Sequence, residues 1–232
     1  MPWSSSLRRA TLWTLCSLAL LTLGGALVAL ADEAPAPEGA TAPPAAEAPA
    51  AEAPARGAAV EARVDSARST LTFLSNAPSE RIEGQAAGIE GAFRFSPENP
   101  GDVSGSLQVP VSALRSGNSL RDRHIAGRDW LLASSHPHIR FDLQRVEVRS
   151  TERSGMRVDI SGVAHGTLTL RGATRPTTAD ITVSLALDTQ RVRVQFSMQA
   201  NLRAHDIPGR RNSIGREVAE NIEIQGTVHG SW

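Results

Sequence analysis

The chain has 232 residues, and its 24 basic residues, all of them Arg, balance its 24 acidic residues to give a formal net charge of zero. This balance excludes the strongly basic surface that marks most nucleic-acid-binding domains. The single Cys excludes a framework of disulfide bonds, so folding stability must come from the burial of apolar side chains.

The first 31 residues have the features of a secretory signal peptide. Arg8 and Arg9 precede an apolar run, and Ala29-Leu30-Ala31 provides the small residues that a signal peptidase requires. We therefore expect cleavage after Ala31 and a periplasmic or secreted protein. An uncleaved membrane anchor is the alternative, because residues 10–30 are numerous enough to span a bilayer.

Residues 32–59 form a tract rich in Pro, Ala and Glu, with five acidic residues and one Arg. The tract has no bulky apolar side chain to bury, and its Pro residues oppose both helix and sheet hydrogen bonding. We expect a semi-extended, disordered linker, which is either a spacer from a membrane or a simple solvated tail. The folded domain should then cover residues 60–232.

From residue 60 onward, apolar and polar residues alternate, which predicts β-strands with one buried face. The alternation is most regular over residues 191–203, where even-numbered residues are apolar and odd-numbered residues are polar. With a short first strand at residues 60–64, the pattern predicts eight or nine strands. The other apolar residues that share a face within their segments are Leu71 and Phe73; Ile89, Phe93 and Phe95; Val103, Leu107, Val109 and Val111; Ile139, Phe141 and Leu143; Met156, Val158, Ile160, Ala164, Leu168 and Leu170; Ile181, Val183, Leu185 and Leu187; and Ile222, Ile224 and Val228.

Two irregularities are expected in these strands. The parity of the apolar residues changes between Leu143 and Val146, which predicts a β-bulge near Gln144-Arg145. Gly162 and Gly166 lie on an apolar face, where a long strand would coil or kink. All connections but one are too short for a crossover, so sequential strands should pair antiparallel, and closure into a barrel would remove the sheet edges.

The long connection, residues 112–137, should contain a short helix that caps one mouth of the barrel. Asn118 or Ser119 can cap this helix, and Asp122 lies favourably in its first turn. Gly127 and Asp129 indicate two short turns rather than one long helix. One helical face would carry Leu120, His124, Gly127 and Leu131.

The alternation does not decide whether the barrel is packed or hollow. An eight-stranded barrel is either filled by its own side chains or holds one small ligand. Small inward residues such as Ala164 and Ala200, together with an aromatic content of 4%, favour a cavity that a hydrocarbon could fill. An ordinary packed barrel rich in Ala and Gly is the alternative.

The polar residues give weaker indications of a functional site than the apolar alternation gives of the fold. The six His residues, including His136 and His138, lack the spacing of a metal site. Asp122 and His124 could form half of an acid–base pair, but no nucleophile motif accompanies them. Two sets of Arg residues could either bind an anionic lipid head at a mouth or form a solvated face. These are Arg121, Arg123 and Arg128 in the long connection and Arg210, Arg211 and Arg216 in the loop before the last strand.

Four elements occur in a fixed order: Arg121-Asp122-x-His124, Trp130-Leu131, Pro137-x-Ile139-x-Phe141, and Leu168-Thr169-Leu170-x-Gly172-x-Thr174-x-Pro176. With this order and spacing, residues 60–229 resemble the YceI-like family. The resemblance implies an all-β fold, an antiparallel eight-stranded lipocalin-like β-barrel with one short helical insertion, which holds an isoprenoid or another long-chain lipid.

The resemblance further implies a non-enzymatic protein without a resident cofactor or metal, whose partner is a lipid, with a membrane nearby. The residues expected to line the cavity and its mouth are Phe73, Phe93, Phe95, Leu120, His124, Trp130, Leu131, Ile139, Phe141, Leu168, Leu170, Val194, Phe196 and Met198. Two other functions remain: a packed barrel that docks on a membrane complex, and a weak hydrolase that uses Asp122 and His124.

Overall fold

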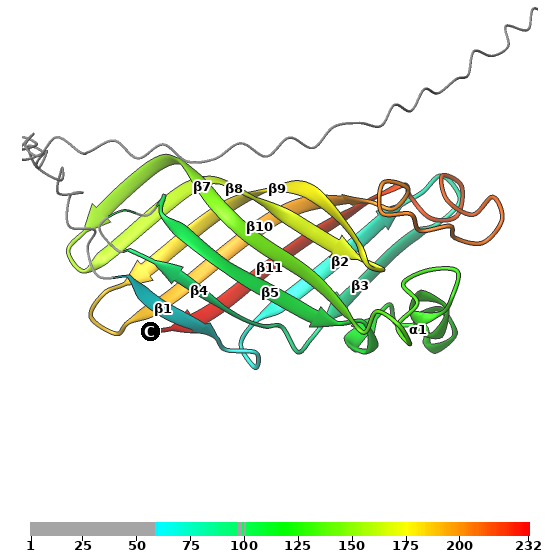
Figure 1. Cartoon of the computed structure of the whole chain (residues 1–232), viewed down its shortest axis with the longest axis horizontal. Coiled ribbons are helices and arrows are strands. Elements are labelled where there is room, and N and C mark those ends of the chain that lie inside the picture. Colours follow the sequence, from blue (N-terminus) through cyan, green and yellow to red (C-terminus); the bar gives the residue numbers. More distant parts are fainter. Residues whose placement is uncertain (1–58, 97–98, 100) are drawn as a thin grey trace, which may run out of the picture. The chain divides into compact units, whose positions relative to one another are not determined.

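A computed structural model describes residues 59–96, 99 and 101–232 of the chain. The expected signal peptide, residues 1–31, and all but the last residue of the expected linker lie outside the described residues. Among the helices in the part that is described, none is long and apolar enough to cross a membrane. The elements, shown in Figure 1, are β1 (Val60–Val64), β2 (Thr70–Asn76), β3 (Arg81–Ala86), β4 (Glu90–Phe95), β5 (Val103–Pro110), a 3₁₀ turn (Val111–Ala113), β6 (Leu114–Arg115), α1 (Ser119–Ala126), β7 (His138–Ser154), β8 (Arg157–Leu170), β9 (Ala173–Ala186), β10 (Arg191–Asn201) and β11 (Asn221–Ser231).

Eight of these strands form a closed antiparallel barrel in the order β1-β4-β5-β7-β8-β9-β10-β11. The ring closes where β11 pairs with β1, with Ser231 opposite Arg63 and Gly230 opposite Val64. Closure satisfies the hydrogen-bonding groups that an open sheet would leave at its edges. The predicted fold class, an antiparallel eight-stranded barrel with a short helical insertion, is therefore confirmed.

The pairing differs from the expectation that sequential strands are neighbours. β1 pairs with β4 and β11, whereas β2 pairs with β3 and with residues 223–227 of β11. β1 and β2 thus pair with different parts of the same edge of β11, and a turn at residues 65–69 connects β1 to β2. β2, β3 and β6 extend the sheet beyond the ring, so the described sheet has eleven strands rather than eight or nine.

The alternation correctly predicts which faces of the strands are buried. In β10, Met198 and Ala200 are buried and Val192, Val194 and Phe196 are half-buried, while the odd-numbered residues from Arg191 to Gln199 are exposed. Met156 is an exception: it lies in the turn before β8 and is 55% exposed, although its parity matches that of the buried residues of β8.

β7 and β8 are joined through irregular pairing. The register shifts between Leu143 and Arg145, which confirms the predicted bulge, and again between Val148 and Ser150. The two glycines of β8 permit a close approach rather than a break in the strand. A Cβ at Gly162 would lie 2.4 Å from the carbonyl oxygen of Glu147, and one at Gly166 would lie 2.2 Å from that of Asp142.

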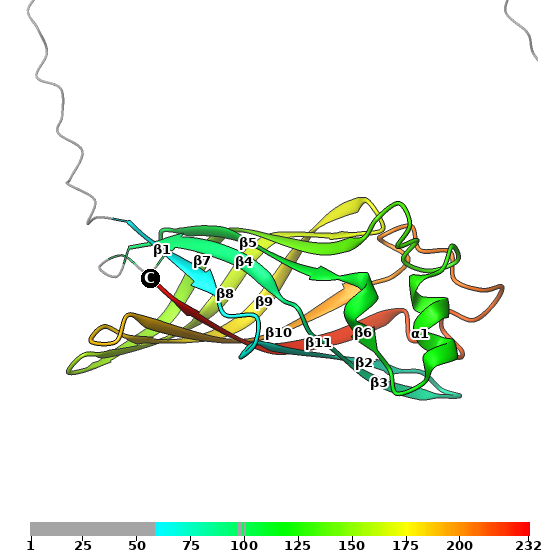
Figure 2. The ribbon, with the colours of Figure 1, turned by 90° about the horizontal axis from the view of Figure 1, so that it is seen from below.

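The two ends of the barrel differ. In both views, α1 and the segment that joins β10 to β11 lie at one end, and the C-terminus lies at the other (Figures 1 and 2). At the C-terminal end, Phe95 and Trp232 pack edge to face with ring centroids 5.2 Å apart. The segment from β10 to β11, residues 202–220, is a second long connection, so the expectation of only one was wrong.

Candidate functional site

The barrel encloses a lumen whose walls are entirely apolar. The space within it that the centre of a water molecule can occupy is about 160 Å³, and each of the 25 residues that line it has an apolar side chain. Such a lining arises because every barrel strand turns its apolar parity inward. Of the residues predicted to form the site, those in the lumen wall are Phe93, Phe95, Ile139, Phe141, Leu168, Val194, Phe196 and Met198.

A second cavity forms the mouth of the barrel beneath α1, and the centre of a water molecule can occupy about 270 Å³ of it. The two cavities adjoin each other, because both are lined by Leu71, Val109, Ile139 and Ile224. The mouth contains the predicted residues Phe73, His124, Trp130, Leu131, Ile139 and Leu170. In contrast to the lumen, it also has polar lining residues: Ser75, Glu80, Arg121, His124, Arg210, Ser213 and Glu217.

Residues at its two ends determine where α1 begins and ends. The Asn118 side chain accepts hydrogen bonds from the backbone N–H groups of Leu120 at 3.0 Å and Arg121 at 3.2 Å, as expected for a helix cap. Gly127 follows the last helical residue. The assignment of Leu120 to the site was wrong: its side chain is 52% exposed and lines neither cavity, while Ile125 lines the mouth in its place.

Four of the polar side chains of the mouth pair with one another. Arg210 Nη2 lies 2.6 Å from His124 Nε2 and donates to it, which requires the neutral imidazole with its proton on Nδ1. Arg121 forms an ion pair with Glu80 of the β2–β3 turn. Arg210 thus joins the 202–220 segment to α1 across the mouth, whereas Arg211 and Arg216 are exposed and lie outside the lining.

The hypothesis of an acid–base pair between Asp122 and His124 lacks support in the geometry. The Asp122 carboxylate accepts hydrogen bonds from the Ser116 hydroxyl at 2.7 Å and from the Ser116 N–H at 2.8 Å. These hydrogen bonds hold the pKa of Asp122 below its usual value. Asp122 therefore fastens the start of α1, while His124 faces Arg210. In the described part of the chain, no group of three or more His, Cys, Asp or Glu side chains is placed to hold a metal ion.

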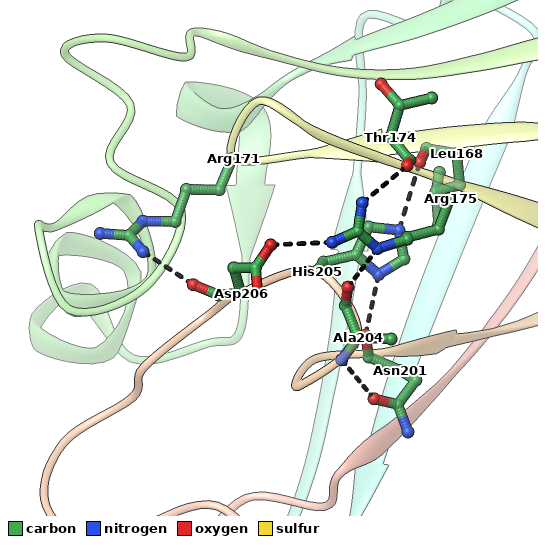
Figure 3. A network of polar contacts seen from close by, with 8 residues as sticks. All are labelled: Leu168, Arg171, Thr174, Arg175, Asn201, Ala204, His205 and Asp206. Atoms are coloured by element: carbon green, nitrogen blue, oxygen red, sulfur yellow. Dashed lines mark hydrogen bonds and ion pairs between the residues drawn. The ribbon is translucent and has the colours of Figure 1, made fainter. Parts of the chain in front are cut away.

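The wall formed by residues 202–220 is fastened to the barrel through the network in Figure 3. His205 is 2% exposed, and its two ring nitrogens face the carbonyl oxygens of Asn201 at 2.8 Å and Leu168 at 3.2 Å. Arg175 donates to the carbonyl oxygen of Ala204 at 2.6 Å and pairs with Asp206 at 2.9 Å. These contacts join the start of the segment to β8, β9 and β10, so it forms a fixed part of the mouth.

Sequence reasoning missed several residues of the site. Ala179 and Ile181 of β9 line the lumen, and the alternation that identified Phe196 was sufficient to find them. Ile207 and Val218 line the mouth from the 202–220 segment, where no periodic pattern indicates burial. The predicted residues from Phe73 to Met198, apart from Leu120, nevertheless line these two adjoining cavities.

Comparison with known proteins places this barrel in a family. A UPF0312 protein of Pseudomonas aeruginosa (strain LESB58) is 27% identical over 97 residues, which is 42% of this chain and 46% of that protein. Protein YceI of Escherichia coli O157:H7 is 26% identical over 92 residues, 40% of this chain and 44% of that protein. The chain thus aligns with less than half the length of either relative.

Two solved structures share the fold. BcnA of Burkholderia cenocepacia matches with a TM-score of 0.56 and 19% identity, covering 72% of this chain and 98% of that one. A domain from Saccharophagus degradans, described as a polyisoprenoid-binding domain implicated in plant cell wall breakdown, matches with a TM-score of 0.52 and 16% identity, covering 73% and 97%. The YceI-like domain model matches residues 63–229, and with this match over most of its length the chain belongs to the YceI-like family.

Proposed function

We propose that the protein binds a long-chain amphiphile, an isoprenoid being the best fit, with the apolar tail in the lumen and the polar head at the mouth. The observation that carries this proposal is the lumen itself, with 25 apolar residues and no polar side chain in its wall. A hydrocarbon gains about 0.8 kcal/mol for each methylene group that it removes from water, so such a surface favours a long tail.

The combined length of the lumen and the mouth supports a long tail. The inward side chains of β10, with Leu202 after it, line the two cavities continuously from Val192 to Leu202. Ten residues of strand span about 34 Å, or about 26 Å along the axis of a barrel whose strands tilt by about 40°. One leaflet of a bilayer has a hydrocarbon layer of about 15 Å. The lumen and the mouth together are therefore long for a common acyl chain and suit a longer isoprenoid, in agreement with the description of the Saccharophagus degradans domain.

The division between apolar lumen and polar mouth supports binding at a fixed orientation. His124, Arg121 and Arg210 offer hydrogen-bonding groups at the mouth, and the opposite end is filled by Phe95 and Trp232. The ligand head would face the mouth because burying an unpaired polar group in the lumen would cost several kcal/mol. We propose a carrier rather than an enzyme, acting in the periplasm or outside the cell as the N-terminal residues suggest.

A substitution that fills the lumen tests this proposal. Ala164 is 4% exposed, lines the lumen on β8 and pairs with Ala179 of β9. Ala164→Phe would place a ring in the space assigned to the lipid tail, so the lipid that co-purifies with the protein should fall. Val163→Phe is the matched control, because Val163 lies on the outer face one residue away.

The same pair of variants distinguishes a hollow barrel from a packed one. In a hollow barrel, Ala164→Phe should leave the free energy of unfolding within about 1 kcal/mol of that of the unsubstituted, lipid-free protein. In a packed barrel the added ring should cost about 1–3 kcal/mol or more. Unchanged lipid content in Ala164→Phe, measured by extraction and mass spectrometry, would contradict the assignment of the tail to the lumen.

A further inference from the structure

A pocket on the outer surface carries an unusual concentration of positive charge. It lies at the end of the barrel opposite α1, offers about 220 Å³ to the centre of a water molecule and does not share the mouth described above. The basic side chains that line it are Arg68, Arg157, Arg191, Arg193 and His229. They come from the β1–β2 turn and from β8, β10 and β11, which meet at this end of the barrel.

The strand register brings these groups together. Arg193 of β10 lies directly opposite His229 of β11 on one side and Ser184 of β9 on the other. Arg191, two residues away on the same outer face, lies opposite Ser231 and Ala186. Directly opposed residues of antiparallel strands have Cβ atoms about 5 Å apart, so the side chains of Arg193 and His229 are neighbours.

His229 is held in position by the β1–β2 turn. The backbone N–H of His229 donates to the Ser69 hydroxyl at 3.0 Å, and its backbone carbonyl oxygen accepts from the backbone N–H of Asp65 at 2.7 Å. Ser69 is itself buried. Arg68 precedes Ser69 in the chain, so the β1–β2 turn also brings a further guanidinium group to the pocket.

Few carboxylates offset this charge. Arg157 pairs with Asp159 at 2.9 Å, but within the described residues Arg68, Arg191 and Arg193 form no ion pair. Burial lowers the pKa of His229, Arg68 and Arg193 lower it further through charge repulsion, and the Asp65 carboxylate acts in the opposite direction. Like charges on directly opposed strand positions destabilise a sheet, so a bound anion would favour the protonated form of His229 opposite Arg193.

We propose that this pocket is a binding site for a phosphate or sulfate group. Arg191 and Arg193, on one strand and with the same outward parity, would donate charge-assisted hydrogen bonds to the oxygens of the anion, and Arg68 and His229 would flank it. Guanidinium groups suit tetrahedral oxyanions because they present several N–H donors in one plane. The site is separate from the lumen and does not depend on the proposed lipid.

Titration with inorganic phosphate tests this proposal. The ring of His229 and the backbone amides of Arg191 and Arg193 would be followed by NMR while phosphate replaces chloride at constant ionic strength. We expect saturable shifts with a dissociation constant on the order of millimolar, since two charge-assisted hydrogen bonds contribute most of the binding. The variant R191Q/R193Q should weaken binding about tenfold or more.

The control variant R211Q/R216Q removes the same charge at the other end of the barrel and should leave the affinity unchanged. Glycerol 3-phosphate, used alongside inorganic phosphate, separates the two sources of this group: tighter binding of the ester indicates a lipid headgroup, and equal binding indicates free phosphate. Shifts that do not saturate with phosphate, the ester or sulfate, or that persist in R191Q/R193Q, would overturn the proposal.

Discussion

Phe196 offers a sharp test of the inward register of β10. Its side chain lines the lumen, and its ring lies against Gly226 of β11, where a Cβ would come within 2.6 Å of the ring. Gln195, one residue earlier, lies on the outer face between Thr182 and Thr227 and is exposed. A carboxylate introduced at these two adjacent positions therefore meets opposite environments.

The expected difference is large. Removing the half-buried ring in Phe196→Asp should cost up to about 3 kcal/mol, and burying a carboxyl group without a partner should add about 2 kcal/mol or more. The total approaches the entire stability of a typical domain, about 5–15 kcal/mol. Gln195→Asp should change the free energy of unfolding by about 0.5 kcal/mol or less, because it alters an exposed polar residue.

Urea denaturation followed by circular dichroism measures both variants. We expect Phe196→Asp to be largely unfolded or to have a much lower midpoint, and to retain no lipid, while Gln195→Asp resembles the unsubstituted protein. Equal effects of the two substitutions, or a cost below about 1 kcal/mol for Phe196→Asp, would refute the register and with it the apolar lumen.

Three further predictions concern other parts of the chain. N-terminal sequencing of the exported protein should begin at Asp32, whereas recovery of Arg8 and Arg9 in a membrane fraction would show an uncleaved anchor. Trp130 lines the mouth, so in a Trp232→Phe background its fluorescence emission should shift when lipid is removed. Trp130→Ala should reduce lipid retention and cost less stability than the loss of a core aromatic residue, which is about 3–5 kcal/mol. Unchanged emission and unchanged retention would remove Trp130 from the site. Because the fold lowers the pKa of His229, the stability that neutral His229 contributes is fully present above about pH 6.5 and is lost as the pH falls. In chloride buffer, His229→Gln should therefore lose less stability than the unsubstituted protein between about pH 7 and 5. Parallel pH profiles of the two proteins would contradict this prediction.

The barrel was predictable because alternation with period two is a local signal. It located most strands and the bulge at Gln144-Arg145. β3 was missed because Ile82 is the only large apolar residue on its inward face, where Gly84 and Ala86 follow. The pairing of β1 with β4 was missed for a different reason: alternation identifies the buried face of a strand but not its neighbour.

The site was predictable to the extent that it consists of strand faces. Phe93, Phe141 and Phe196 point into the lumen because their parity is inward. Leu120 was misassigned although it shares a helical face with His124: it lies in the first turn of α1, and its side chain is 52% exposed. The contact between His124 and Arg210 joins residues 86 positions apart, and no local pattern encodes it.

The central claim is that the lumen holds a long apolar tail, and mass spectrometry of the natively purified protein tests it most directly. The intact complex should carry an added mass, and solvent extraction should release an amphiphile with a long isoprenoid or comparable chain, close to one molecule per protein. A barrel that is recovered empty, and that stays empty after incubation with a total lipid extract of its host, would contradict the account.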